Sequence, residues 1–222
     1  MGIMREIAKR QRAFEKELLR ALGPATKGTF WKKSSTALYM QSGSFFQDFV
    51  ISVRFNDEKV GIFHTFKPMA LDFLLWHILG MAENASAPLS FRTWGAFTCG
   101  GLPIHEALLE QAEDPADMAA NLVGIAKDNE SLFQEFLQEE NYSALLAKHP
   151  NQVERGAYAV TLVTSLINDG DYESAACLAS EYNSGRRHSV NQISSSGVSF
   201  HRLALDWLDA GKTSRSFAIT GI

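Results

Sequence analysis

The 222-residue sequence contains little cysteine and no long apolar run. Its two cysteines, Cys99 and Cys177, are too few for a disulfide framework, and they lack the paired spacing of a zinc site. No stretch approaches the roughly 18 uninterrupted apolar residues of a membrane helix. These absences exclude a disulfide-stapled domain and a membrane-spanning chain, and we expect both thiols to be reduced.

The motifs of common catalytic sites are also missing. There is no phosphate loop ending in Lys-Ser or Lys-Thr, no Gly-x-Gly-x-x-Gly, no Gly-x-Ser-x-Gly and no His-Glu-x-x-His. The six histidines occur singly, with none three or four residues from another. We therefore expect no cofactor and no metal.

The composition, 45% apolar and 21% charged, is typical of a globular chain rather than a disordered one. The N-terminal residues lead directly into a charged amphipathic pattern without the apolar core of a secretory signal. We expect a cytoplasmic protein.

Charge is unevenly distributed around the net value of −4. Residues 1–111 carry 13 Lys and Arg against 10 Asp and Glu, and residues 112–222 carry 8 against 15. Acidic residues concentrate between Glu113 and Glu140, where Lys127 is the single basic side chain. This segment argues against nucleic-acid binding and forms either a solvated helix face or a docking surface for a basic protein. The candidate partner-binding carboxylates are Glu130, Glu135, Glu139 and Glu140.

Hydrophobic periodicity predicts an α+β fold. Apolar residues at helical spacing predict a first helix over residues 3–22, and alternation on both sides of a turn at 56–59 predicts an antiparallel hairpin over 45–67. Shorter runs at 30–31, 37–40 and 89–99 predict further strands, giving an antiparallel sheet of four or five. The sheet is interrupted by a helix over 68–79, which begins at Pro68.

After Gly100-Gly101 the pattern predicts helices. One starts near Pro103, and another runs from the Asp114-Pro115 start signal to about residue 140. Further helices are expected at 152–168, 171–183 and 198–210, ending at Gly170, Gly185 and Gly211, and the first two of these form a helical hairpin. We expect a sheet domain over 1–111 and a helical region over 112–222 packed on it, or a single domain containing both.

One enzyme hypothesis rests on Cys99. A thiol at a strand end, before Gly100-Gly101 and a helix N-terminus, could have a lowered pKa, and His77 or His105 would then act as the base. Such a site would serve a thiol-dependent hydrolase or transferase. The alternative is an inert core cysteine, because cysteine is among the most buried residue types.

Other candidate residues have a structural and a functional interpretation. Arg92 and Trp94 would share one face of the strand expected at 89–99, and an exposed Arg–Trp pair is typical of an interface hot spot. The segment from Arg186 to Ser189 could be a kinase site, an anion clamp or a solubilising loop, of which we favour the last. His64 is expected to be a hydrogen-bonded core histidine.

The order of several sequence features in residues 1–100 can be compared with that of known protein families. A charged first helix precedes Lys32-Lys33 and a hairpin, and Lys67-Pro68, Asp72 and Trp76 begin the next helix, with Pro88 to Arg92 following. This part of the chain resembles uncharacterised small bacterial α+β proteins of the toxin-immunity type. The resemblance implies an immunity protein with no catalytic motif to carry over. The missing catalytic motifs, the acidic C-terminal part and the helical hairpin favour a non-enzymatic protein-binding module, an immunity or inhibitor protein that neutralises a basic partner.

Overall fold

The computed structural model describes residues 2–35, 37–54, 56–94, 97–137, 141–149, 158–189 and 193–213. It confirms the α+β class, with an N-terminal helix, a five-stranded antiparallel sheet and helices in the C-terminal part. The chain divides into a sheet unit (1–69, 89–94 and 101–139) and a helical unit (70–88, 95–100 and 140–222). The two units interleave in sequence, and the expected boundary at residue 111 lies inside the sheet unit.

The five strands form a meander in which each strand pairs with the next along the chain. They are β1 (Lys32–Lys33), β2 (Ala37–Ser42), β3 (Phe45–Val53), β4 (Lys59–Pro68) and β5 (Leu102–Glu110). The expected hairpin is β3 and β4, with Phe49 opposite His64 and Val53 opposite Val60. The alternating sequence produces this hairpin because successive side chains of a strand point to opposite faces.

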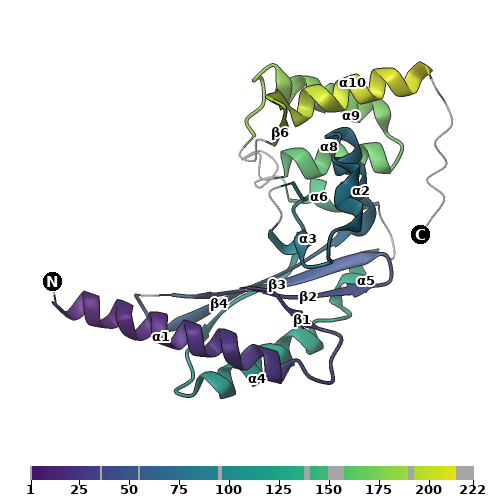
Figure 1. Cartoon of the computed structure of the whole chain (residues 1–222). Coiled ribbons are helices and arrows are strands. Elements are labelled where there is room, and N and C mark those ends of the chain that lie inside the picture. Colours follow the sequence, from purple (N-terminus) through teal and green to yellow (C-terminus); the bar gives the residue numbers. More distant parts are fainter. Residues whose placement is uncertain are drawn as a thin grey trace. The chain divides into compact units, whose positions relative to one another are not determined.

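Two helices, α1 (Gly2–Ala25) and α4 (Pro115–Asp128), cover one face of the sheet (Figure 1). Their apolar stripes and the inward residues of β2, β3 and β4 form one buried cluster, in which Leu18, Leu22, Phe49 and Leu122 are fully buried. The start of α4 follows the predicted signal, since the Asp114 carboxylate accepts a hydrogen bond from the Ala116 backbone N–H at 2.8 Å. Between these elements, burial of apolar surface is the main stabilising interaction.

The helical unit contains a helical hairpin, as the sequence predicts. Its helices α8 (Ala159–Asn168) and α9 (Tyr172–Asn183) are joined at Gly170, which has a φ of +82°. The Asp171 side chain caps α9 by accepting from the Ser174 N–H at 3.1 Å. The elements of this unit are α2 (Met69–Ile78), η1 (Ala82–Ser86), α6 (Tyr142–Ala147), α8 (Ala159–Asn168), α9 (Tyr172–Asn183), β6 (Ser194–Ser195), β7 (Val198–Ser199) and α10 (Phe200–Thr213). No helix among the described residues is both long and apolar enough to cross a membrane.

The prediction of a strand at 89–99 is wrong. Residues Phe91–Trp94 form a short helix, α3, and the backbone after it bonds to side chains instead of to a strand. The Phe97 carbonyl accepts from Trp76 Nε1 at 2.6 Å, the Cys99 N–H donates to Asp72 at 2.8 Å, and the Gly100 N–H donates to Thr161 at 2.8 Å. These bonds satisfy backbone groups that a sheet ladder would otherwise satisfy.

Three helix predictions also need correction. The helix expected from Pro103 is strand β5, and the helix expected over 114–140 is divided into α4 and α5 (Leu132–Leu137), because the chain turns at Asn129. Gly211, expected to end the last helix, lies inside α10. The helix expected at 152–168 is described from residue 159, and its first six positions lie outside the described residues.

His64 is a hydrogen-bonded core histidine, as predicted, and is fully buried. Its Nε2 lies 3.0 Å from Gln47 Oε1, and Gln47 Nε2 donates to the Glu130 carbonyl at 3.2 Å. Because the Gln47 oxygen can only accept, His64 carries its proton on Nε2. The rings of Trp31 and Phe49 contact the imidazole edge-on, with centroids 5.4 and 5.5 Å away.

Burial lowers the pKa of His64 from 6.5 to about 3, with a smaller contribution from neighbouring His105. Between these two values the unfolded chain binds a proton that the folded chain does not, so stability decreases as the pH falls. From pH 7 to pH 4.5 the loss from His64 is about 2.5 kcal/mol.

A His64→Gln variant should therefore lose less of its free energy of unfolding than the wild type over this range, measured by denaturant titration at both pH values. His201, whose pKa burial lowers to about 4, contributes in both proteins and cancels in the comparison. Equal losses in the two proteins would contradict this assignment.

Gln11 is a buried polar side chain within the apolar stripe of α1. It is 0% exposed, and neither atom of its amide has a hydrogen-bond partner among the described residues. We expect Gln11→Leu to raise the free energy of unfolding by about 1–2 kcal/mol, because an unsatisfied buried amide is removed. Glu17→Leu, at an exposed position of the same helix, is the control and should change stability much less. A Gln11→Leu protein that unfolds more easily than the wild type would show that the amide has a stabilising role.

Candidate protein-binding surface

Strand β5 forms one edge of the sheet. It is nine residues long and pairs with β4 on one side, and the sheet of the described chain ends there. Pro103, which has no N–H to donate, is tolerated because an edge strand needs only half of its backbone groups for the ladder. The register shifts between His64 and Thr65, so the pairing is regular from His105 to Glu110. Over that stretch alternate N–H and C=O groups point away from β4.

Close packing at the start of this strand requires a glycine. A Cβ atom at Gly101 would lie 2.8 Å from the Cβ of Thr65 and 3.2 Å from the Phe66 carbonyl oxygen. No real side chain fits at that separation, so glycine permits β5 to approach β4 here. Gly101 therefore positions the edge strand.

The outward side chains of β5 alternate acidic, apolar and acidic. Glu106, Leu108 and Glu110 are exposed, whereas the residues between them are half-buried. Leu108 is 45% exposed and lies opposite Gly61, whose missing side chain leaves it uncovered. Phe63, on β4 opposite Glu106, is 38% exposed on the same face. We call Phe63, Glu106, Leu108 and Glu110 the β5 surface.

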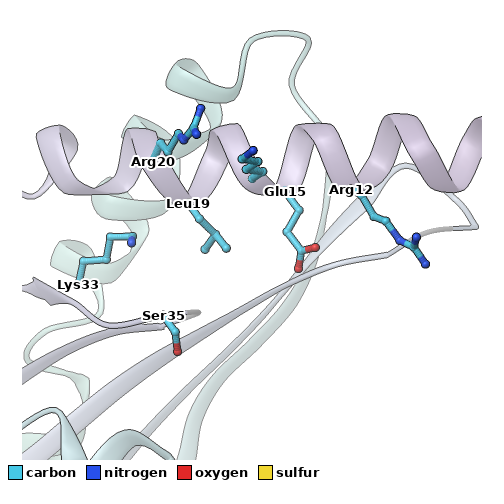
Figure 2. A pocket seen from close by; sticks show the side chains of 7 residues that line it. Arg12, Glu15, Leu19, Arg20, Lys33 and Ser35 are labelled. Carbon is cyan, nitrogen blue, oxygen red and sulfur yellow. The ribbon is translucent and has the colours of Figure 1, made fainter.

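The opposite edge of the sheet differs in length and in charge. β1 has two residues, Lys32 and Lys33, and both are exposed. A cleft of about 340 Å³ lies between this edge and α1, and its cationic side chains are Arg12, Lys16, Arg20 and Lys33. Figure 2 shows Glu15 and Leu19 projecting from α1 toward the segment with Lys33 and Ser35. The sheet unit is thus basic at the β1 edge and acidic along β5, where Lys59 forms an ion pair with Glu110 at 3.1 Å.

The structure places two of the four predicted partner-binding carboxylates. Glu135 is exposed on α5, and Glu130 is half-buried at the turn between α4 and α5. Glu139 and Glu140 lie outside the described residues. That this segment binds a basic partner remains a prediction. Because Glu135 is exposed outside the β5 surface, its substitution is a control for substitutions of that surface.

Arg92 does not lie on an exposed strand face. It is 5% exposed within α3, its guanidinium donates to the Met69 carbonyl at 3.3 Å, and its own carbonyl accepts from Lys67 Nζ at 3.4 Å. The expectation of an exposed Arg92 is therefore wrong, because the local chain is helical and the side chain bonds to backbone. Trp94 is the last residue of α3, and its side chain lies outside what the structure describes.

The three residues of the thiol hypothesis lie in different environments. Cys99 is 3% exposed in the helical unit, His77 is exposed on α2, and His105 is half-buried on β5 of the sheet unit. The helix N-terminus expected to activate the thiol is absent, since β5 begins at Leu102. Within the described residues, no group of three or more His, Cys, Asp or Glu side chains could hold a metal ion.

Comparison of the chain with protein-family models, with curated proteins and with solved structures finds no match. Sequence analysis did not identify the β5 surface, because a helix was expected to start near Pro103, after the Gly100-Gly101 break. The signal that indicates a strand is the alternation of exposed Glu106, Leu108 and Glu110 after the Gly100-Gly101 break. Leu108 obscured it, because an outward leucine disrupts the usual polar and apolar pattern of a strand.

The two cysteines allow a direct test of thiol accessibility. Cys177 is exposed on α9 and should react with iodoacetamide at close to the rate of a model thiol at pH 7.5. Cys99 should react at least roughly tenfold more slowly, because burial excludes the reagent. Peptide mass mapping over time gives both rates in one sample. Faster labelling of Cys99 than of Cys177 would support the thiol-enzyme hypothesis.

Proposed function

We propose that this chain is a protein-binding module that accepts an extended basic segment of a partner protein along the outer edge of β5. The proposal is carried by one observation, the long open edge of β5 with its row of Glu106, Leu108 and Glu110. Backbone hydrogen bonds to such an edge supply affinity, and alternate side chains supply specificity.

The difference between the two sheet edges supports the choice of β5. Proteins protect edge strands from pairing with other chains by making them short and by placing lysine on them. β1 has both features, with two residues that are both lysine. β5 has neither feature, since it is nine residues long and contains no lysine.

Side-chain chemistry defines the segment that fits. A strand added beside β5 places its residues directly opposite those of β5, where opposite charges and apolar pairs are favourable. Cationic residues fit opposite Glu106 and Glu110, and an apolar residue fits opposite Leu108. Phe63 extends the apolar part of the surface on the adjacent strand. The partner segment is therefore basic, apolar and basic at alternate positions.

A second copy of this chain fits less well. In an antiparallel pair of β5 strands centred on Leu108, Glu106 of each copy would lie opposite Glu110 of the other. Like charges directly opposite each other are destabilising. A basic partner also associates faster with an acidic edge, because complementary charge steers encounter. The biological role that we propose is that of an immunity or inhibitor protein neutralising a basic partner.

Two synthetic peptides test this proposal and stand in for the partner segment. One eight-residue peptide has Lys or Arg alternating with Val or Leu on one strand face, and the other has the same composition in an order that destroys the alternation. Fluorescence anisotropy with the full chain should show saturable binding of the first, weakened by added salt, and at least roughly tenfold weaker binding of the second. Equal affinity for the two peptides would contradict edge pairing.

Substitutions that introduce a positive charge on the β5 surface test whether the peptide binds there. We expect Glu106→Lys and Leu108→Arg each to weaken binding of the alternating peptide roughly tenfold or more. Glu135→Lys on α5 and Asp117→Lys on α4 change an exposed carboxylate elsewhere in the sheet unit and are the matched controls. Loss of binding in Glu135→Lys with retention in Glu106→Lys would instead assign binding to the acidic segment and reject the β5 surface.

A further inference from the structure

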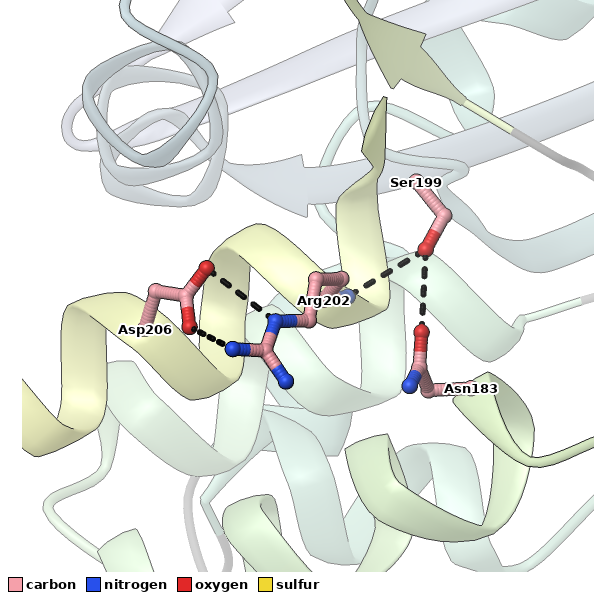
Figure 3. Close-up of polar contacts among 4 residues, drawn as sticks. All are labelled: Asn183, Ser199, Arg202 and Asp206. Carbon is pink, nitrogen blue, oxygen red and sulfur yellow. Dashed lines mark hydrogen bonds and ion pairs between the residues drawn. The ribbon is translucent and has the colours of Figure 1, made fainter. Parts of the chain in front are cut away.

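A second candidate site lies in the helical unit, in a cavity of about 620 Å³ between the end of α9, residues 185–189, the β6–β7 hairpin with Ile193 before it, and the first turn of α10. This volume is in the range of small-molecule sites. Figure 3 shows part of its wall, where the Ser199 hydroxyl donates to Asn183 Oδ1 and accepts from the Arg202 N–H, both at 3.3 Å. The guanidinium of Arg202 bonds instead to Asp206 along α10. This wall of the cavity is therefore polar, and hydrogen bonds between its side chains hold it in place.

Two buried polar side chains line this cavity. Tyr182 and His201 are each 6% exposed, and within the described part of the chain neither imidazole nitrogen of His201 makes a hydrogen bond. The Tyr182 hydroxyl has the guanidinium of Arg187 beside it, and it donates its own proton to no group in the described part of the chain. Their rings stack with centroids 4.8 Å apart and an angle of 21° between planes. Unsatisfied buried polar groups are rare because they are costly, and beside a cavity they indicate a ligand.

The charge of the lining favours an anion. Among the described residues that line the cavity there is no carboxylate, whereas Arg187 and His188 are both present. Glu181 bonds to Nε of Arg187 at 3.0 Å, and a guanidinium has four further N–H groups. Burial raises the pKa of Tyr182, and a hydrogen bond from Arg187 to the Tyr182 hydroxyl, together with the positive charge of Arg187, opposes this rise. Burial keeps His201 neutral at pH 7, with a pKa of about 4, so its ring offers one N–H donor.

The donor set and the volume favour a phosphate group attached to an organic group. A guanidinium, imidazole N–H groups and hydroxyls surround the cavity from several elements, which suits a tetrahedral anion with several acceptor oxygens. A cavity of about 620 Å³ far exceeds a single ion, since one water occupies roughly 30 Å³. Ile193 and the stacked rings of Tyr182 and His201 provide the less polar wall that an organic group requires.

We propose that this cavity binds a small phosphomonoester, whose phosphate group lies against Arg187 and accepts hydrogen bonds from Tyr182 and His201. This site is separate from the β5 surface and does not depend on the proposed partner binding. It favours the anion-clamp interpretation of the Arg186 to Ser189 segment over the solubilising one.

Calorimetric titration of the full chain with phenyl phosphate and with inorganic phosphate tests the proposal. Phenyl phosphate should bind at sub-millimolar concentration and at least roughly fivefold more tightly than inorganic phosphate. Equal affinity for both would contradict the assignment to an ester, and absence of heat with either probe at millimolar concentration would overturn the site.

Three variants test the assigned roles. Tyr182→Phe and His201→Phe keep the aromatic packing, and we expect each to weaken phenyl phosphate binding roughly five- to tenfold. Arg187→Gln should weaken it more, whereas Arg202→Gln, which removes a nearby guanidinium bonded to Asp206, is the control. The ligand-free Tm of His201→Phe should equal or exceed that of the wild type, because this change removes two unsatisfied buried nitrogen atoms. Wild-type affinity in both aromatic variants, or an equal loss in Arg202→Gln, would overturn the proposal.

Discussion

An antiparallel sheet that does not close into a barrel ends in two strands, and each of these has half of its backbone hydrogen bonds unmade by the sheet. This constraint shapes the sheet unit. At one end the chain uses a two-residue strand of lysines beside α1, so few backbone groups are presented. At the other end it presents β5, which is nine residues long with an exposed leucine between exposed glutamates. An exposed edge strand of this length would favour non-specific pairing with other strands. The carboxylates on both sides of Leu108 disfavour acidic strands and a second copy of β5, so we expect the edge to select basic partners.

Buried polar groups have different consequences according to what surrounds them. His64 is part of a chain of hydrogen bonds through Gln47 to the Glu130 carbonyl, and this chain links the sheet to the turn that follows α4. Asp72 accepts from the Cys99 N–H and thereby fixes the path of the segment before β5. Within the part of the chain that the structure describes, His201 makes no such bond and lines a cavity with Tyr182, which is why we assign these two side chains to a ligand.

The parts of the fold that sequence analysis predicted correctly are those with simple local patterns. The β3–β4 hairpin follows from strict alternation around a turn, and the helical hairpin of α8 and α9 follows from Gly170 and the Asp171 cap. The secondary structure predicted for residues 89–110 was wrong. A strand was predicted where the short helix α3 forms, and a helix was predicted where β5 forms. The reason is physical: the backbone of 97–100 is satisfied by Trp76, Asp72 and Thr161, which are distant in sequence, and β5 is a strand because β4 pairs with it.

The candidate sites divide in the same way. Composition and motif absences were enough to direct attention from common catalytic chemistry toward binding, and an anion clamp was one of three interpretations of Arg186 to Ser189, although a solubilising loop was favoured. Only tertiary structure decided that Arg92 and Cys99 are buried, that Glu106, Leu108 and Glu110 share an open edge, and that Tyr182 and His201 line one cavity with Arg187. Local sequence determines the periodicity of an element, but exposure and hydrogen-bond satisfaction depend on which distant elements pack against it, and these properties select the residues that remain available to a partner or ligand.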